Sequence, residues 1–92
     1  MQYKRSKKEI EYCEYLSMAI KKLRQDRKKS MNCLAFDSLL SSATLCRIEN
    51  NQNTPHITKI AQVAYGLGVP LSELIIEMEK ILPKNFILAD ET

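Results

Sequence analysis

Apolar residues recur at steps of three and four along most of this chain, and this spacing limits its fold more than any other feature. Such steps place side chains on one face of an α-helix, whereas a half-buried strand needs strict alternation. The pattern indicates helices near residues 7–26, 42–49, 54–67 and 71–82, with a short one near 31–38. Strand pairs, internal repeats and low-complexity segments are not evident. The sequence therefore predicts an all-α fold, a compact five-helix bundle.

Polar residues at the ends of these segments support the prediction. Ser6, Ser30 and Ser41 are placed as N-caps, because a serine hydroxyl can accept a free amide of the first helical turn. Thr54 followed by Pro55 predicts the start of the fourth helix, with threonine as the cap and proline at the first helical position. The expected helix ends are Asn50–Asn51, Gly68 and Pro83.

The composition favours one folded domain. Its 92 residues are 45% apolar and 27% charged, enough for one modest core and unlike a disordered chain. No apolar run approaches the roughly 20 residues of a membrane-spanning helix. The basic start, residues 1–8, is not followed by an apolar stretch, so we expect neither a secretory signal nor a membrane anchor. A cytoplasmic, nucleoid-associated location in a bacterial or phage-type setting is the corresponding expectation.

Charge is distributed unevenly along the chain. Residues 1–29 hold ten basic and four acidic residues, a net charge of +6, whereas residues 30–70 are neutral and residues 71–92 carry −3. An anionic partner would be attracted mainly to the N-terminal part. The alternative is that these lysines form a solvated helix face, and some of them suit the negative end of a helix dipole.

Metal-binding and catalytic signatures are absent from the sequence. Cys13, Cys33 and Cys46 lack a C-x-x-C spacing and are accompanied only by His56. Free thiols in a reducing compartment explain them better than a metal or redox site. We find no nucleophile–base pair, no glycine-rich phosphate loop and no carboxylate cluster. The sequence therefore predicts a protein without a cofactor that is not an enzyme.

The segment 41–50 has two different faces if it is helical. Leu45 and Ile48 fall on one side and can enter a core. Ser42, Ala43 and Arg47 fall on the other side, together with a cysteine. Small side chains allow the helix to approach another surface closely, where one arginine can form specific hydrogen bonds with the groups that it contacts. An ordinary surface helix of a bundle has the same pattern, so both interpretations stay open at this point.

The order and spacing of these helices and of their apolar and polar positions resemble those of the phage-repressor-like, Xre-type helix-turn-helix domains that bind operator DNA. The resemblance runs without a gap from Arg24 to Leu74 and begins near Leu16. It is carried by Leu16, Ile20, Leu23, Arg24, Ser30, Leu34, Ala35, Ser41, Leu45, Arg47, Ile48, Glu49, Pro55, Ile60, Val63, Ala64, Leu67, Gly68, Val69, Glu73 and Leu74. It implies a lambda-repressor-like domain over residues 16–82, preceded by a basic extension over 1–15 and followed by a tail over 83–92.

The resemblance also implies roles for individual residues. Helix 31–38 would cross the DNA backbone, and helix 42–49 would enter the major groove. The implied base contacts are Ser42, Ala43 and Arg47. The implied phosphate contacts are Lys28, Lys29, Ser30, Asn32, Asn50 and Asn53. Arg24 and Glu49 would form a structural ion pair between the first and third helices.

Three positions depart from the family pattern. Met31 replaces a glutamine just after the helix cap, and Lys29 replaces an apolar residue just before it. Leu39 stands where the turn between the second and third helices usually has glycine. Because leucine is strained in a left-handed conformation, this turn is where the chain is expected to differ.

The implied partner is double-stranded operator DNA, bound by a homodimer that associates through residues 71–88. An antitoxin that represses its own operon is a close variant of this hypothesis. The alternative is a protein-interaction module with weak DNA binding, which would use Tyr12, Tyr15, Met18 and the last helix. Because a fold does not determine a function, the sequence leaves this alternative open.

Overall fold

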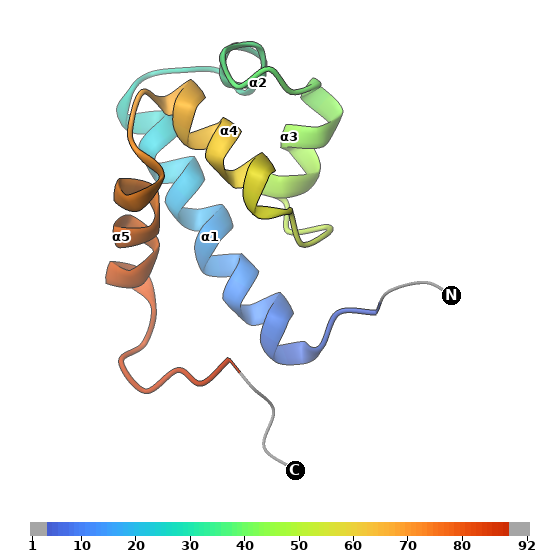
Figure 1. Cartoon of the computed structure of the whole chain (residues 1–92), viewed down its shortest axis with the longest axis vertical. Helices are drawn as coiled ribbons and strands as arrows, with labels where there is room; N and C mark the ends of the chain where they lie inside the picture. Colours follow the sequence, from blue (N-terminus) through green and yellow to red (C-terminus); the bar gives the residue numbers. More distant parts are fainter. Residues whose placement is uncertain (1–3, 89–92) are drawn as a thin grey trace.

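The computed structural model describes residues 4–88, and the predicted all-α, five-helix architecture is confirmed within them. The helices are α1 (Lys7–Asp26), α2 (Met31–Asp37), α3 (Ser42–Glu49), α4 (Ile57–Leu67) and α5 (Leu71–Ile81). In Figure 1, the long α1 runs through the molecule, with α5 packed along one side and α3 and α4 on the other. The start of the basic extension, residues 1–3, and the acidic end of the tail, residues 89–92, lie outside the described residues.

One core joins all five helices. Its buried side chains are Leu16, Ala19, Ile20, Leu23, Leu34, Ala35, Leu45, Ile48, Val63, Ala64, Leu67, Val69, Leu74 and Met78. The predicted apolar stripes supply most of this core. Ile10 and Ile57, which continue the apolar spacing of α1 and α4 in the sequence, are instead 41% and 61% exposed. Both lie in the first turn of their helices.

Three of the predicted N-caps are confirmed. The Oγ atoms of Ser6, Ser30 and Ser41 accept hydrogen bonds from backbone amides three residues later, over 3.0, 3.0 and 3.1 Å. Each bond satisfies an amide that has no partner within its own helix. The serines therefore define the starts of α1, α2 and α3.

The predicted start of the fourth helix was wrong. Helix α4 begins at Ile57, and its N-cap is His56 rather than Thr54. The Oγ1 atom of Thr54 instead lies 3.5 Å from the Sγ atom of Cys13 in α1. Thr54 therefore contacts α1 instead of capping α4, and Pro55 lies before the first residue of the helix.

Helices α1 to α4 end in the same way. A residue with positive φ follows each one: Lys28 (54°), Leu39 (61°), Asn51 (53°) and Gly68 (77°). The amide of the next residue then bonds to a carbonyl five positions earlier, over 2.9 to 3.1 Å. This is the Schellman pattern, which satisfies carbonyl groups left free at a helix end. The turn at Leu39 therefore keeps the left-handed geometry that was expected to change.

Gly66 has a packing role that its sequence context does not reveal. A Cβ atom at this position would lie 2.9 Å from the amide nitrogen and 3.0 Å from the Cα atom of Ser38. It would also collide with the buried Ser38 hydroxyl. Only glycine allows α4 to approach the end of α2 this closely.

Within residues 4–88, no single helix is long and apolar enough to cross a membrane. Helices α4 and α5 reach such a length and apolarity only as a pair, across a bend of 99°.

The left-handed Leu39 gives a testable prediction about stability. Its side chain is 78% exposed, so little packing is lost when it is removed. We expect Leu39→Gly to raise the free energy of unfolding by about 1 kcal/mol, because glycine adopts positive φ without strain. Urea denaturation measures this change. Leu39→Ala is the matched control and should give no such gain, since alanine keeps the strain. Equal stability of the two variants would contradict the strained turn.

Candidate nucleic-acid interface

Helix α3 presents one buried and one exposed face. Leu45 and Ile48 are 0% and 3% exposed and pack into the core. Ser42, Ala43 and Arg47 are exposed on the opposite face. The helix therefore has the orientation that its sequence predicted, with two small side chains and one long cationic side chain directed away from the bundle.

The end of α3 is held by donors from α1. The Nε and Nη2 atoms of Arg24 donate to the two carboxylate oxygens of Glu49 over 2.8 and 3.0 Å. The Glu49 side chain is fully buried and that of Arg24 is 15% exposed, so this is the expected ion pair in a largely dry setting. Ser17, which is also buried, donates its hydroxyl to the Ile48 carbonyl over 2.7 Å. These bonds keep the position of α3 fixed relative to α1.

The starts of α2 and α3 lie together at this surface. Ser30 and Asn32 are exposed, and the Ser42 hydroxyl donates to Asn32 Oδ1 over 2.8 Å. This bond uses the Asn32 oxygen and leaves its amino group as a donor. Met31 is half-buried and packs against the core, so this departure from the family pattern contributes packing.

The two lysines before α2 lie in different environments. Lys28 is exposed, but the ammonium of Lys29 lies 2.7 Å from Asp37 Oδ2 and 2.6 Å from the Gly66 carbonyl oxygen. The hydrogen bond from Lys29 holds the pKa of the Asp37 carboxyl below its usual value. Lys29 therefore connects α2 to α4, and these two bonds use two of the three N–H donors of its ammonium group.

The loop between α3 and α4 has exposed and engaged asparagines. Asn50 and Asn53 are exposed, and the Asn50 amino group lies 3.2 Å from Cys46 Sγ. Asn51 is directed toward α1, where its Nδ2 donates to the Ile10 carbonyl over 2.9 Å. Its side-chain oxygen accepts a hydrogen bond from Arg5. Of these three asparagines, Asn50 and Asn53 remain accessible to an outside partner.

A hollow of about 300 Å³ lies beside Arg47 and contains residues that the sequence analysis missed. Its other lining residues are Thr44, Ile48, Asn53, Thr54, Pro55, His56 and Lys59. Neither Arg47 nor Lys59 forms an ion pair with any residue from 4 to 88. Because Lys59 is 12 positions from Arg47 in the sequence, no local spacing could have shown that these two cationic side chains line the same hollow.

The described part of the chain contains no group of three or more His, Cys, Asp and Glu side chains arranged to hold a metal ion. Cys13, Cys33 and Cys46 are free thiols. The exposed side chains around α3, among them Ser42, Arg47 and Asn53, offer hydrogen-bond donors, acceptors and positive charge. Such a surface is suited to binding a polar, anionic partner.

No protein-family model matches the chain. It is 36% identical over 72 residues to the HTH-type transcriptional regulator SutR of Escherichia coli (strain K12). This alignment covers 78% of the chain but only 40% of SutR, so the chain spans less than half the length of that relative.

Solved structures of two regulators have a similar fold. The clp gene regulator ClgR of Corynebacterium glutamicum superposes with a TM-score of 0.72 at 23% identity, over 80% of this chain and 96% of that one. The wild-type restriction-modification controller protein C.Esp1396I superposes with a TM-score of 0.65 at 27% identity. That match covers 75% of this chain and 95% of the controller protein.

The buried ion pair gives a prediction about stability. Arg24→Met should lower the free energy of unfolding by about 3–5 kcal/mol, because it leaves the buried Glu49 carboxylate without its partner. The double variant Arg24→Met, Glu49→Leu should be more stable than the single one. Chemical denaturation measures both.

Lys22→Ala serves as the control. Lys22 pairs with Asp26 over 3.4 Å and with Glu77 of α5 over 3.7 Å, but its own side chain is 55% exposed, so its loss should cost under about 1 kcal/mol. An Arg24 variant that is no less stable than the Lys22 variant would show that the pair does not hold α3.

Proposed function

Because the chain belongs to the Xre-type, lambda-repressor-like family of helix-turn-helix domains, we propose that it is a sequence-specific DNA-binding transcription regulator. It would act as a repressor at the nucleoid by placing α3 in the major groove of an operator. The observation that carries this proposal is the way in which α3 is held at the surface of the bundle. Its outward face is small at Ser42 and Ala43 and holds an unpaired Arg47, while its inner face is fixed to α1.

Arg47 is the residue that we expect to read base identity. Its guanidinium can donate two hydrogen bonds to O6 and N7 of one guanine. Ala43 can contact a thymine methyl group. The hydroxyl of Ser42 is already bonded to Asn32, so Ser42 would instead set how closely α3 approaches the bases.

Phosphate contacts would lie on both sides of α3. On one side are Ser30, Asn32 and the exposed Lys28. On the other side are Asn50 and Asn53, to which the structure adds the neighbouring His56 and Lys59. Lys29 would contribute only through the third N–H donor of its ammonium group, because the other two bond to Asp37 and Gly66.

We propose that the protein is a homodimer that associates through residues 71–88. Leu74 and Met78 are 0% and 1% exposed and face the core, so the contact would involve Ile76, Ile87 and Leu88, each about half exposed. A two-fold dimer would read half-sites roughly one DNA turn apart.

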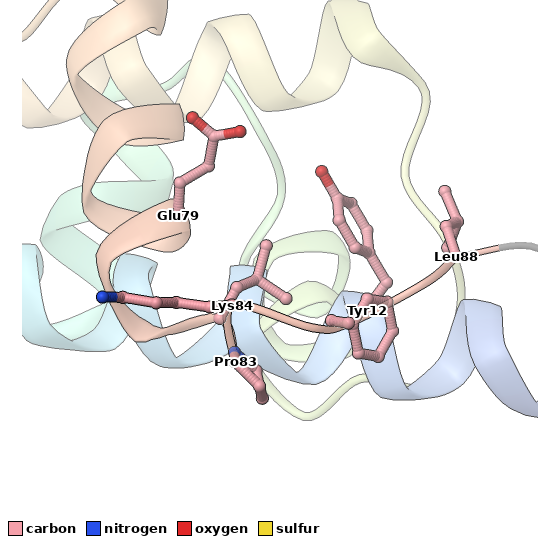
Figure 2. Close-up of a pocket in the computed structure, with 7 residues that line it drawn as sticks. Tyr12, Glu79, Pro83, Lys84 and Leu88 are labelled. Carbon is pink, nitrogen blue, oxygen red and sulfur yellow. The ribbon is translucent and has the colours of Figure 1, made fainter.

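The tail folds back over α1 within this region. The ring of Phe86 lies 6.0 and 6.1 Å from the rings of Tyr12 and Tyr15, and the Lys8 ammonium is 5.3 Å from its centre. A hollow of about 360 Å³ lies between Tyr12, Glu79 and the tail (Figure 2). Burial, followed by the charge of Glu79, raises the pKa of the Tyr12 hydroxyl. The two tyrosines that could have bound another protein thus contact the chain's own tail.

An interaction module or antitoxin-type partner remains the second candidate function. Phe36, Leu39 and Tyr65 are 81%, 78% and 72% exposed, and apolar side chains this exposed favour contact with another protein. Phe36 lies in α2, Leu39 follows that helix, and Tyr65 lies in α4. These two segments are neighbours, as shown by the hydrogen bond from Gln62 Nε2 of α4 to the Leu39 carbonyl over 3.4 Å. Salt titration separates the two functions. Operator binding weakens steeply as salt rises, because contacts to phosphate release counterions, whereas an apolar contact barely responds.

Arg47→Ala tests the base-reading role. Operators are first selected from random duplex DNA at moderate salt, and Kd is then measured on operator and random DNA. The substitution should reduce the discrimination between them by roughly 1–3 kcal/mol and leave the melting temperature unchanged. Lys59→Ala is the control and should weaken binding to both DNAs alike. An Arg47 variant that loses affinity equally on both DNAs would argue against the assignment.

Ile76→Glu tests the dimer. A buried, unpaired carboxylate is costly, so we expect the variant to sediment as a monomer at concentrations where the wild type is dimeric. Because Ile76 is 51% exposed in the chain alone, the substitution should change the thermal stability of the monomer little. Sedimentation velocity measures the mass. A wild type that is monomeric at all concentrations would rule out this seam.

A further inference from the structure

Arg5 and Asn51 are 46 positions apart in the sequence and form a double hydrogen bond. The Nη1 atom of Arg5 donates to the Asn51 side-chain oxygen over 2.8 Å, and Nη2 donates to the Asn51 carbonyl oxygen over 2.9 Å. Both bonds are partly shielded from water. Arg5 precedes the region that resembles the helix-turn-helix family, so this contact attaches an added segment to the domain.

Asn51 is the residue on which the end of α3 depends. Its backbone is left-handed, with φ of 53°, and this conformation lets the Gln52 amide bond to the Arg47 carbonyl over 2.9 Å. Its side chain also donates to the Ile10 carbonyl. Arg5 on one side and Ile10 on the other thus hold one residue that determines where the α3–α4 loop leaves the helix.

The loop that follows has few other attachments. Gln52, Asn53 and Thr54 are exposed, and the nearest further tie is the contact between Thr54 and Cys13. A loop of exposed polar residues opens at low free-energy cost unless its ends are fixed. The clamp on Asn51 fixes the end that adjoins Arg47.

We propose that Arg5 is a positioning residue for the DNA interface, acting through Asn51 to hold the α3–α4 loop and the end of α3 in their binding geometry. This inference rests on the proposed function. Arginine suits the role because its planar fork can grip two oxygens of one residue at once, which the single ammonium of a lysine cannot do with the same geometry.

Binding measurements on two Arg5 variants test this role. Arg5→Ala should weaken operator binding about tenfold, and Arg5→Lys should weaken it nearly as much although it keeps the charge. The dependence of log K on log salt should keep its slope, because no phosphate contact is lost. Recovery of affinity in Arg5→Lys, or a slope reduced by about one in Arg5→Ala, would overturn the proposal in favour of a direct phosphate contact.

Lys7→Ala is the matched charge control. Lys7 is exposed at the start of α1, and its substitution removes the same charge without touching the clamp. It should change Kd less than twofold. A loss as large as that of Arg5→Ala would attribute the effect to charge and overturn the proposal. So would an Arg5→Ala variant that only melts at a lower temperature and binds DNA normally at 25 °C.

A double-mutant cycle with Asn51→Gly tests the connection to Asn51. Glycine tolerates the left-handed backbone and removes only the side chain. In this background, Arg5→Ala should cost distinctly less affinity than in the wild type, because one of its two acceptors is already gone. Fully additive losses would show that Arg5 acts independently of Asn51.

Hydrogen exchange of the free protein separates this inference from the proposed function. Arg5→Ala should speed exchange of the Gln52 amide at least several-fold and leave the core amides of α1 unchanged. This measurement requires no DNA. Faster Gln52 exchange in a protein that binds no DNA would retain the clamp and reject the regulator role. Unchanged exchange together with unchanged Kd would reject the clamp.

Discussion

The buried ion pair between Arg24 and Glu49 is the interaction on which the arrangement of this domain depends. A carboxylate with no exposure to water is tolerated only where a fixed cation satisfies both of its oxygens. Arg24 does so from α1 and also donates to the Lys29 carbonyl over 3.0 Å. One side chain thus holds both the end of α3 and the segment that leads into α2. These contacts hold the buried end of α3 and so determine where its exposed face lies.

The helices α1 to α4 end in compact left-handed turns, and three of these four turns are formed without glycine. Lys28, Leu39 and Asn51 adopt the left-handed conformation that only Gly68 adopts freely. The strain at these residues is offset by the carbonyl groups that each turn satisfies and by the compact connection that it allows. Because α3 is eight residues long, a different exit at Asn51 would displace the whole face that carries Arg47. The turns are therefore part of the scaffold and would also shape the proposed interface.

The distribution of charge in space differs from its distribution along the chain. The N-terminal third is strongly basic, yet Arg24 serves an internal ion pair, Lys29 connects α2 to α4 and Arg5 grips Asn51. The hollow beside α3 instead holds Arg47 and Lys59, which come from a part of the sequence with no net charge. In the proposed interface, the N-terminal segment would therefore contribute less, and α4 more, than a count of lysines and arginines along the sequence indicates.

The amino-acid sequence by itself determined the features that depend on near neighbours. These are the five helical segments, the serine caps at Ser6, Ser30 and Ser41, and the inward face of Leu45 and Ile48, because capping and helical periodicity act within a few residues. The tertiary structure decided the features in which a distant partner competes with a local one. Thr54, which was predicted to cap a helix, contacts Cys13, and the Lys29 ammonium group bonds to Asp37. Gly66 is needed because Ser38 lies against it, and Lys59 reaches Arg47 only through the packing of α4. Such contacts join residues many positions apart, and a single sequence contains no local signal of which distant groups folding will bring together.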